Sequence, residues 1–469
     1  PNPQAMYDKL KDVVDIAGGK KIKLKRTDDV WKEVTGKLAS STAGIKLAQG
    51  GEVLRNYQIS AKLGSATLSA ISDDAFVALT HWYNGTTSLR SAISTITKLS
   101  PDSKADRVQA LAWGGDADYA IRSVTQSSRF SEVTGYGATA KAADITIRLS
   151  GLQAWTNATK HQFERDFLRG MVANSWDALG RKRQRAFQRY GVTQSDWAEI
   201  QSGYQKINGD QMLIPTAIAD ENVRRRVLGM LINETRFAVP TPGAKTRAVL
   251  HQGTQRGTAA GEATRAIMSL KSFPVTLITT HWARAFAAES GWDSMKYIVA
   301  MVAGTTALGS VALQSKRIAS GKEPLPIDSK EFFAASLLQG GGLGIFGDFI
   351  FMDHNRFGSN TIANIMGPVA GDIEKYLFRM LLGTTQDFME LDHDKFMDRL
   401  RRIPGTVVKD LTPLQLWYTK LLMDRYLFDR IHKETDPKWQ SRTKKYERQL
   451  QKSQGAGYWW QPGEMAPES

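Results

Sequence analysis

The sequence of 469 residues contains no cysteine, and this absence excludes disulfide bonds, thiolate zinc sites and cysteine nucleophiles together. Histidine is scarce as well: the 7 histidines are scattered, and no two have the i, i+4 spacing of a helical zinc site. The sequence also lacks a Walker-type phosphate-binding loop and a dinucleotide fingerprint. We therefore expect no cofactor and no metal site, and a structural or binding protein rather than an enzyme.

Alternation of apolar and polar residues, the pattern of half-buried strands, is rare in this sequence. Helical spacing recurs instead, for example at Phe163, Phe167 and Met171. The sequence therefore predicts an all-α, elongated protein of several domains. The exception is residues 20–26 (KKIKLKR), whose period of two predicts a short edge strand or an extended basic arm.

Glycine and proline punctuate the chain near residue 102, at residues 240–243, at residues 321–326 and at residues 404–405. These breaks predict four regions. They are an N-terminal helical region with a short basic arm (1–102), a basic helical region (103–240), an apolar region with a membrane-active helical hairpin (241–403), and C-terminal amphipathic helices with a tryptophan-rich clasp (404–469).

Basic residues outnumber acidic ones, 62 to 47, which gives a formal net charge of +15. This excess favours polyanionic partners, either nucleic acid or an anionic membrane surface. The densest basic clusters contain Arg181, Lys182, Arg183, Arg185, Arg189, Arg224, Arg225 and Arg226. Such clusters can follow the backbone of double-stranded DNA, or line a lumen, without reading sequence. A solvated helix face, or an interface with an acidic neighbouring subunit, explains them equally well.

Two apolar runs stand out in the third region. Residues 297–313 carry no charge and as a helix would span ~25 Å, less than the ~30 Å hydrocarbon core of a bilayer. Residues 332–352 contain one charge, Asp348, and several glycines. The two runs predict a helical hairpin, in which small residues such as Ala303 and Ala307 allow close packing. Buried helices of a large soluble assembly show the same pattern, so membrane insertion is one of two interpretations.

The tripeptide Glu289-Ser290-Gly291 matches the setting in which lytic transglycosylases present their catalytic acid. The Gly-Leu-Met-Gln segment that those enzymes carry further along does not follow, and an apolar run stands in its place. A peptidoglycan lytic transglycosylase that uses Glu289 is therefore the enzyme alternative. A helix terminus is the simpler interpretation of this tripeptide.

The C-terminal region has a sequence that neither catalysis nor core packing demands. Thr412, followed by proline, predicts the start of a helix that runs to about Lys433, and Asp436, also followed by proline, predicts its end. A basic amphipathic stretch and a glycine linker then lead to residues 459–463 (WWQPG). The candidates for membrane or interface contact are Tyr297, Leu313, Phe332, Phe346, Phe349, Trp417, Trp459 and Trp460.

This C-terminal run, over residues 403–467, resembles the end of the large internal virion proteins of short-tailed bacteriophages, with a looser likeness at residues 63–68 and 342–348. The resemblance implies a protein that is stored in the virion interior and ejected with the genome. It would then form part of an oligomeric tube or channel for DNA across the host periplasm and inner membrane. The lytic transglycosylase domain that such proteins often carry near their N-terminus has no counterpart in this sequence.

The same resemblance implies several partners: further copies of this chain, other ejection or core proteins, the portal, double-stranded DNA of any sequence and, transiently, the host membrane. A pore-forming toxin is the membrane alternative, because such toxins also hide a hydrophobic hairpin inside a soluble helical fold. The tail at residues 459–463 argues against a toxin.

Overall fold

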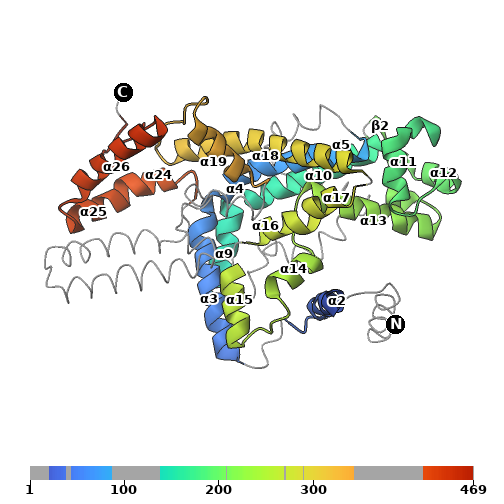
Figure 1. Cartoon of the computed structure of the whole chain (residues 1–469), viewed down its shortest axis with the longest axis horizontal. Coiled ribbons are helices and arrows are strands. Elements are labelled where there is room, and N and C mark those ends of the chain that lie inside the picture. The colour runs from blue at the N-terminus through green and yellow to red at the C-terminus, as the bar shows by residue number, and fades with distance from the viewer. Residues whose placement is uncertain are drawn as a thin grey trace.

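The computed structural model describes residues 21–38, 44–86, 138–207, 209–268, 271–288, 290–342 and 416–467. In this part of the chain 73% of the residues are helical and 3% lie in strands, which confirms the predicted all-α class. Figure 1 shows the described elements spread along one long axis, with the C-terminal helices at one end and the β-hairpin near the other.

The helices follow one another in four groups. The first group contains α2 (Lys21–Val34), α3 (Ile45–Lys62), α4 (Ala66–Ala70) and α5 (Asp74–Asn84). The second contains α9 (Ala138–Leu149), α10 (Leu152–Gly170), α11 (Gly180–Gln188), α12 (Trp197–Ser202), β1 (Tyr204–Ile207), β2 (Asp210–Leu213) and α13 (Glu221–Ala238). The third contains α14 (Ala244–His251), α15 (Ala259–Met268), α16 (Ser272–Leu277), α17 (Ala283–Phe286), α18 (Gly291–Ala319) and α19 (Lys330–Gly340). The fourth contains α24 (Lys420–Met423), α25 (Asp429–Thr435) and α26 (Trp439–Gln454). Short π-helical turns join α16 to α17 (Ile278–Trp282) and α24 to α25 (Asp424–Phe428).

The predicted edge strand or extended arm at residues 20–26 is wrong, because the structure places residues 21–26 in the first turns of α2. Lysine and arginine have helix propensities close to that of alanine, so a lysine-rich stretch joins a helix readily when the residues after it are helical. Those residues are helical here, and Asp28 forms an i,i+4 ion pair with Lys32 at 2.6 Å.

Ion pairs with little exposure connect the N-terminal helices to the third group. Glu33 of α2 accepts hydrogen bonds from Arg247 Nε at 3.0 Å and from His251 Nδ1 at 2.8 Å, both on α14. Burial raises the pKa of Glu33, but the interactions of its carboxylate with His251 and Arg247 outweigh burial and lower the pKa on balance. In the same way, Arg55 of α3 pairs with Glu262 of α15 at 2.7 Å.

A β-hairpin that the helical periodicity did not predict connects α12 to α13. Strands β1 and β2 are antiparallel, and Ile207 is the register partner of Asp210. The sequence between the strands is Asn208-Gly209, which is the strongest short-range signal for a tight hairpin. Gly209 has a φ of 91°, a conformation that glycine adopts without strain.

Three hydrophobic cores position the helices of the described part of the chain. The largest joins α10 to α13 and is rich in aromatic residues, such as Trp176 and Trp197, whose ring centroids lie 5.9 Å apart. A second core lies between α3 and α9. The third core packs Phe76 of α5 with Tyr297 and Met301 of α18, and so fixes the N-terminal half of α18 against the rest of the fold (Figure 1).

The loops agree with two of the predicted breaks. A loop follows α13 at residues 239–243, and another joins α18 to α19 at residues 320–329. Contacts nevertheless cross the first of these breaks, because Glu234 before it pairs with Arg284 after it. The division into four regions remains a prediction.

Candidate functional site

Helix α18 is the most unusual element of the described structure. Ser290 caps its start by accepting a hydrogen bond from the Asp293 N–H at 3.1 Å, and Lys316 and Arg317 in its last turn complement the helix dipole. Its 29 residues extend about 44 Å, longer than the ~30 Å hydrocarbon core of a bilayer. Among the described residues it is the one helix that is long and apolar enough to span a membrane.

Only a narrow stripe of α18 is buried. The buried residues Tyr297, Met301 and Thr305 recur at every fourth position, and Gly309 continues the stripe. Most of the other residues of α18 are half-buried or exposed, and several of the exposed ones are apolar: Trp292 is 68% exposed and Val299 57%. The further exposed apolar residues of α18 are Met295, Val311 and Ile318. A single apolar side chain at the surface is ordinary, but a row of them along one helix indicates a contact surface.

Helices α18 and α19 pack together as a hairpin, as predicted, although residues 343–352 of the second predicted run lie outside the described residues. Glycines bring the backbones of the two helices together. A Cβ atom at Gly309 would lie 2.6 Å from the amide nitrogen of Gly340 and 2.7 Å from its Cα. A Cβ atom at Gly340 would lie 2.5 Å from the carbonyl carbon of Thr305. Close packing through small residues is thus confirmed. The specific prediction of Ala303 and Ala307 is wrong, because both are exposed on the far side of α18.

The C-terminal tail clasps the turn of this hairpin. The backbone N–H groups of Trp459 and Trp460 both donate to the carbonyl of Gly321, at 3.1 and 3.2 Å. The Trp459 indole N–H donates to the carbonyl of Ile318 at 3.0 Å. Glu323 and Gly457 are joined twice, since each backbone N–H is bonded to an oxygen of the other residue. We use the term clasp for residues 455–463, which hold the α18–α19 turn through these contacts.

The π-helical turn before α25 also contacts the clasp and stabilises it. Arg425 donates to the carbonyl of Trp460 at 2.6 Å and to Asp429 at 3.1 Å, and the Asp429 carboxylate accepts the Gly463 N–H at 2.8 Å. Both members of this ion pair are buried. Trp460 is 7% exposed, whereas Trp459 is 37% exposed. Of the two adjacent tryptophans, only Trp460 is therefore buried within the fold.

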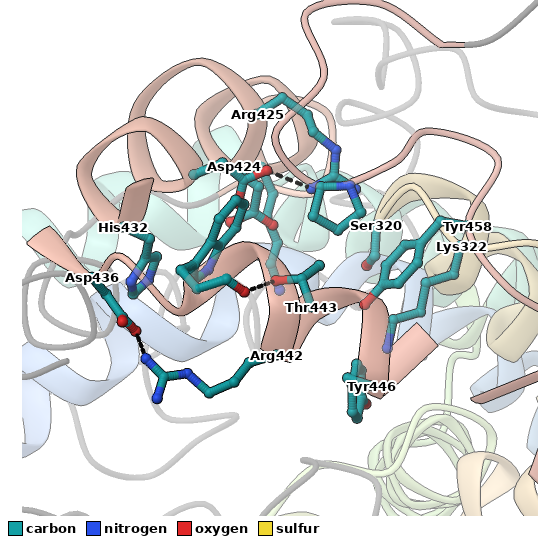
Figure 2. Close-up of a pocket in the computed structure, with 14 residues that line it drawn as sticks. Ser320, Lys322, Asp424, Arg425, His432, Asp436, Arg442, Thr443, Tyr446 and Tyr458 are labelled. Carbon is teal, nitrogen blue, oxygen red and sulfur yellow. Dashed lines mark hydrogen bonds and ion pairs between the residues drawn. The ribbon is translucent and has the colours of Figure 1, made fainter. Parts of the chain in front are cut away.

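A polar cavity of about 520 Å³ lies where the clasp, the hairpin turn, α25 and α26 meet (Figure 2). Its charged groups largely satisfy one another: Asp436 pairs with Arg442, as the close-up shows. Burial raises the pKa of Tyr458 to about 12, so its hydroxyl keeps its proton at neutral pH. Lys322 lies 5.9 Å from the centre of the Tyr458 ring. This cavity is best explained as the joint between the clasp and the hairpin.

At the other end of α18 a buried ionic network holds the helix base. The Glu234 carboxylate of α13 is 0% exposed and accepts from Arg284 at 2.8 Å, from Tyr190 at 2.8 Å and from Asn84 at 2.7 Å. The Arg284 guanidinium also lies 4.4 Å from the centre of the Tyr83 ring. Because a buried carboxylate is costly unless it is paired and hydrogen-bonded, this set of partners fixes α5, α11, α13 and α17 relative to one another.

His281 links this network to α18. Its Nε2 lies 2.8 Å from the carbonyl of Phe237, which can only accept, so Nε2 carries the proton. Its Nδ1, 2.8 Å from Tyr297, therefore accepts from the tyrosine hydroxyl. Burial lowers the pKa of His281 to about 3, and burial lowers the pKa of His81, in α5, to about 4. Both rings are thus neutral near pH 7.

Several basic residues that the sequence predicts to contact DNA instead form hydrogen bonds within the fold. Arg183 donates to the carbonyls of Leu179 and Gly170, at 2.6 and 2.8 Å, and so caps backbone groups around α11. Arg189 donates to Asn84 at 2.7 Å, beside the buried network. Lys182 donates to the carbonyl of Trp82 at 3.1 Å.

The second basic cluster shows the same behaviour. Arg224 donates to the carbonyl of Ile218 at 3.1 Å, and Arg225 pairs with Glu221 at 2.5 Å. Arg226 donates to the carbonyl of Gly191 and pairs with Asp196. Arg181 and Arg185 are exposed on α11. The two clusters therefore do not form one continuous surface of uncommitted charge.

Trp417 joins the C-terminal segment to residues 63–68, one of the two segments with the looser likeness. Its backbone N–H donates to the carbonyl of Gly64 at 3.0 Å, and its indole N–H donates to the carbonyl of Ser150 at 3.1 Å. Residues 416–419 precede α24 as a turn, so the predicted helix from Thr412 is wrong over these residues, and Thr412 itself lies outside the described residues. The helix end before Asp436 is confirmed.

The remaining candidates are placed as follows. Leu313 and Phe332 are half-buried in the hairpin. Glu289, Phe346 and Phe349 lie outside the described residues. Within the described ranges no group of three histidine or acidic side chains could hold a metal ion. No protein-family model, curated protein or solved structure matches this chain.

Proposed function

We propose that this protein is an internal virion protein that leaves a phage particle with the genome and forms part of an oligomeric conduit across the host envelope. The resemblance of residues 403–467 to such proteins suggests the class. The observation that supports the membrane-crossing step is the apolar surface that α18 leaves open to solvent.

The composition of α18 suits a helix that moves from water into lipid. Residues 297–315 carry no charge and extend about 28 Å, close to the ~30 Å hydrocarbon core. Its hydroxyl groups already have partners within the helix: Thr305 donates to the carbonyl of Met301 at 2.8 Å, and Thr306 donates to that of Val302 at 2.7 Å. Hydroxyls that are satisfied within their own helix cost less to place in hydrocarbon.

The clasp suits a protein that is stored in soluble form before it acts. It holds the hairpin turn through backbone and indole hydrogen bonds, and in this state the charged turn, with Lys322 and Glu323, is kept at the protein surface. On insertion, the same turn would stay at one bilayer interface while α18 and α19 enter the lipid, because charges are expensive to carry across.

Vesicle binding tests the membrane-crossing step. Purified protein should sediment with anionic vesicles, and vesicle binding should protect α18 from protease while the loop at residues 320–329 stays accessible. The variant with Val299→Lys and Val311→Lys should bind vesicles more weakly, because a lysine costs about 2.5 to 3.5 kcal/mol at the centre of a membrane helix and a part of that toward its ends, where these two positions lie. Both positions are exposed in the fold, so the variant should still fold.

Val53→Lys with Val249→Lys is the matched control, because it adds the same two charges at exposed valines outside α18. These replacements should leave vesicle binding unchanged. Recovery of all the wild-type protein in the supernatant, at acidic as well as neutral pH, would contradict the proposed function. Killing of intact cells by the purified protein would favour the toxin alternative instead.

A further inference from the structure

One side of helix α26 is strongly basic, whereas its opposite side carries few apolar residues. Its one buried residue is Leu450, with Trp439 and Thr443 half-buried on the same side. At 100° per residue, Lys445 and Arg448 lie on the opposite side of the helix. The further basic residues of that side are Lys444 and Lys452. We call Lys444, Lys445, Arg448 and Lys452 the α26 basic face.

The charge of this face is not balanced locally. The single acidic residue of α26 is Glu447, which is half-buried on the inner side and accepts a hydrogen bond from Gln461. In the described part of the chain, Lys444, Lys445, Arg448 and Lys452 form no ion pair, and all four are exposed. The arginines around α11 and α13 differ, because many of them are committed to backbone carbonyls or acids of the fold.

We propose that the α26 basic face is a docking surface for the phosphate backbone of double-stranded DNA. The inference deepens the proposed function, on which it rests, by moving the main DNA contact from the clusters around residues 181–226 to the C-terminal helix. Charge complementarity identifies the occupant: phosphate contacts need only cations that reach the backbone, and they carry no sequence preference.

The geometry of α26 suits this partner. From Lys444 to Lys452 the face extends about 12 Å along the helix, a length over which one strand of duplex DNA presents about three to four phosphates. The exposed amides of Gln440 and Gln449 flank the lysines and can donate to the same phosphates. Figure 1 places α26 at one end of the described structure.

The helix is also held in place before any ligand binds. Asp436 precedes it and pairs with Arg442 of its first turns. At its other end Gln454 accepts from Arg317 of α18 at 2.9 Å. A rigid helix loses less conformational entropy on binding than a flexible basic tail.

An anionic membrane is a less suitable partner for this face. Helices that lie in a bilayer interface combine a basic side with a broad apolar side that enters the lipid. The inner side of α26 is instead packed on the clasp and α25, and the exposed side carries lysine, glutamine and serine. Insertion would require α26 to leave the fold.

The test compares two variants with the same loss of charge. The test variant carries K444Q, K445Q, R448Q and K452Q. The control variant carries R181Q, K206Q, K245Q and K330Q, which replace exposed basic residues on other elements. Binding of the full chain to two duplexes of unrelated sequence is followed by fluorescence anisotropy over a series of salt concentrations, and circular dichroism confirms that both variants fold.

We expect the wild-type protein to bind both duplexes equally, with an affinity that falls steeply with salt. The test variant should lower the slope of log K against log salt by up to about 3.6, since each phosphate contact contributes about 0.9. The control variant should keep the wild-type slope. Equal slopes for wild type and test variant, or no binding of DNA by the wild type, would overturn the inference.

Vesicle sedimentation with the same proteins separates this inference from the proposed function. Loss of anionic vesicle binding in the test variant, with DNA binding intact, would overturn the inference in favour of a lipid partner. Normal insertion of α18 by a protein that fails to bind DNA would overturn the inference and leave the membrane step standing. DNA binding through α26 by a protein that never inserts would support the inference and count against the proposed function.

Discussion

Replacing Gly309 by alanine should open the α18–α19 hairpin, although alanine is the better helix former. The added Cβ atom would lie 2.6 Å from the amide nitrogen of Gly340, far inside van der Waals contact. Because the obstacle is backbone rather than a flexible side chain, the two helices must move apart. The same replacement at Gly304, on the same helix, meets only the Ala75 side chain at 3.5 Å, which is ordinary contact.

The two replacements should therefore change the stability of the hairpin in opposite directions. Overpacking costs about 1 to 3 kcal/mol, and a backbone clash belongs at the upper end of this range. Alanine returns about 1 kcal/mol of helix propensity, so Gly309→Ala should destabilise the hairpin by about 2 kcal/mol. Local opening should then become about 30-fold more frequent. Gly304→Ala should gain up to ~1 kcal/mol and make opening about 5-fold rarer.

Hydrogen exchange measured by mass spectrometry gives the local opening frequency directly. Peptides from α18 and α19 should exchange faster in Gly309→Ala and slower in Gly304→Ala, while peptides from the α10–α13 core should be unchanged in both. Equal protection of the hairpin in the two variants would refute the close approach of Gly309 to Gly340.

Two further predictions concern the clasp and the base of α18. Trp460→Ala should expose the loop at residues 320–329 to protease, because removal of a buried tryptophan side chain costs about 3 to 5 kcal/mol of stability. Trp459→Ala should have a smaller effect, since Trp459 is 37% exposed. If both variants are cleaved at the same rate, burial does not decide the strength of the clasp. The free energy of unfolding should also fall on acidification. The pKa of His281 is about 3 and that of His81 about 4, both below the ordinary value of about 6.5. Each neutral ring therefore stabilises the fold fully above pH ~6.5, and its contribution falls by about 1.4 kcal/mol per pH unit below that pH. Urea unfolding between pH 7 and 5 should show this dependence of stability on pH. The variant His281→Gln keeps a donor and an acceptor and should remove about half of the dependence. An unchanged dependence in that variant would assign the acid sensitivity to other groups.

Local pattern in the sequence was enough to predict the helical class, the apolar hairpin and the helix end before Asp436. Each depends on residues close together in the chain: spacing on one helix face, a run without charge, or proline after a helix. The wrong prediction at residues 20–26 also came from local pattern. Alternation over a few residues is a weaker signal than the helical residues that follow them. The missed hairpin at Asn208-Gly209 was present as a local signal and could have been found.

Tertiary structure alone decided which charges are committed and what the tail holds. The guanidinium of Arg183 caps carbonyls on other segments, and Glu234 meets Arg284 across a loop, so no count of basic residues could separate these groups from the open lysines of α26. The clasp on Gly321 likewise joins segments that are distant in sequence. Sequence determines the chemistry that each segment offers. Burial and hydrogen bonding between distant segments determine how much of that chemistry stays available at the surface, because a side chain paired within the fold has fewer unused hydrogen bonds and, where its partner is an acid, less unbalanced charge to offer a partner.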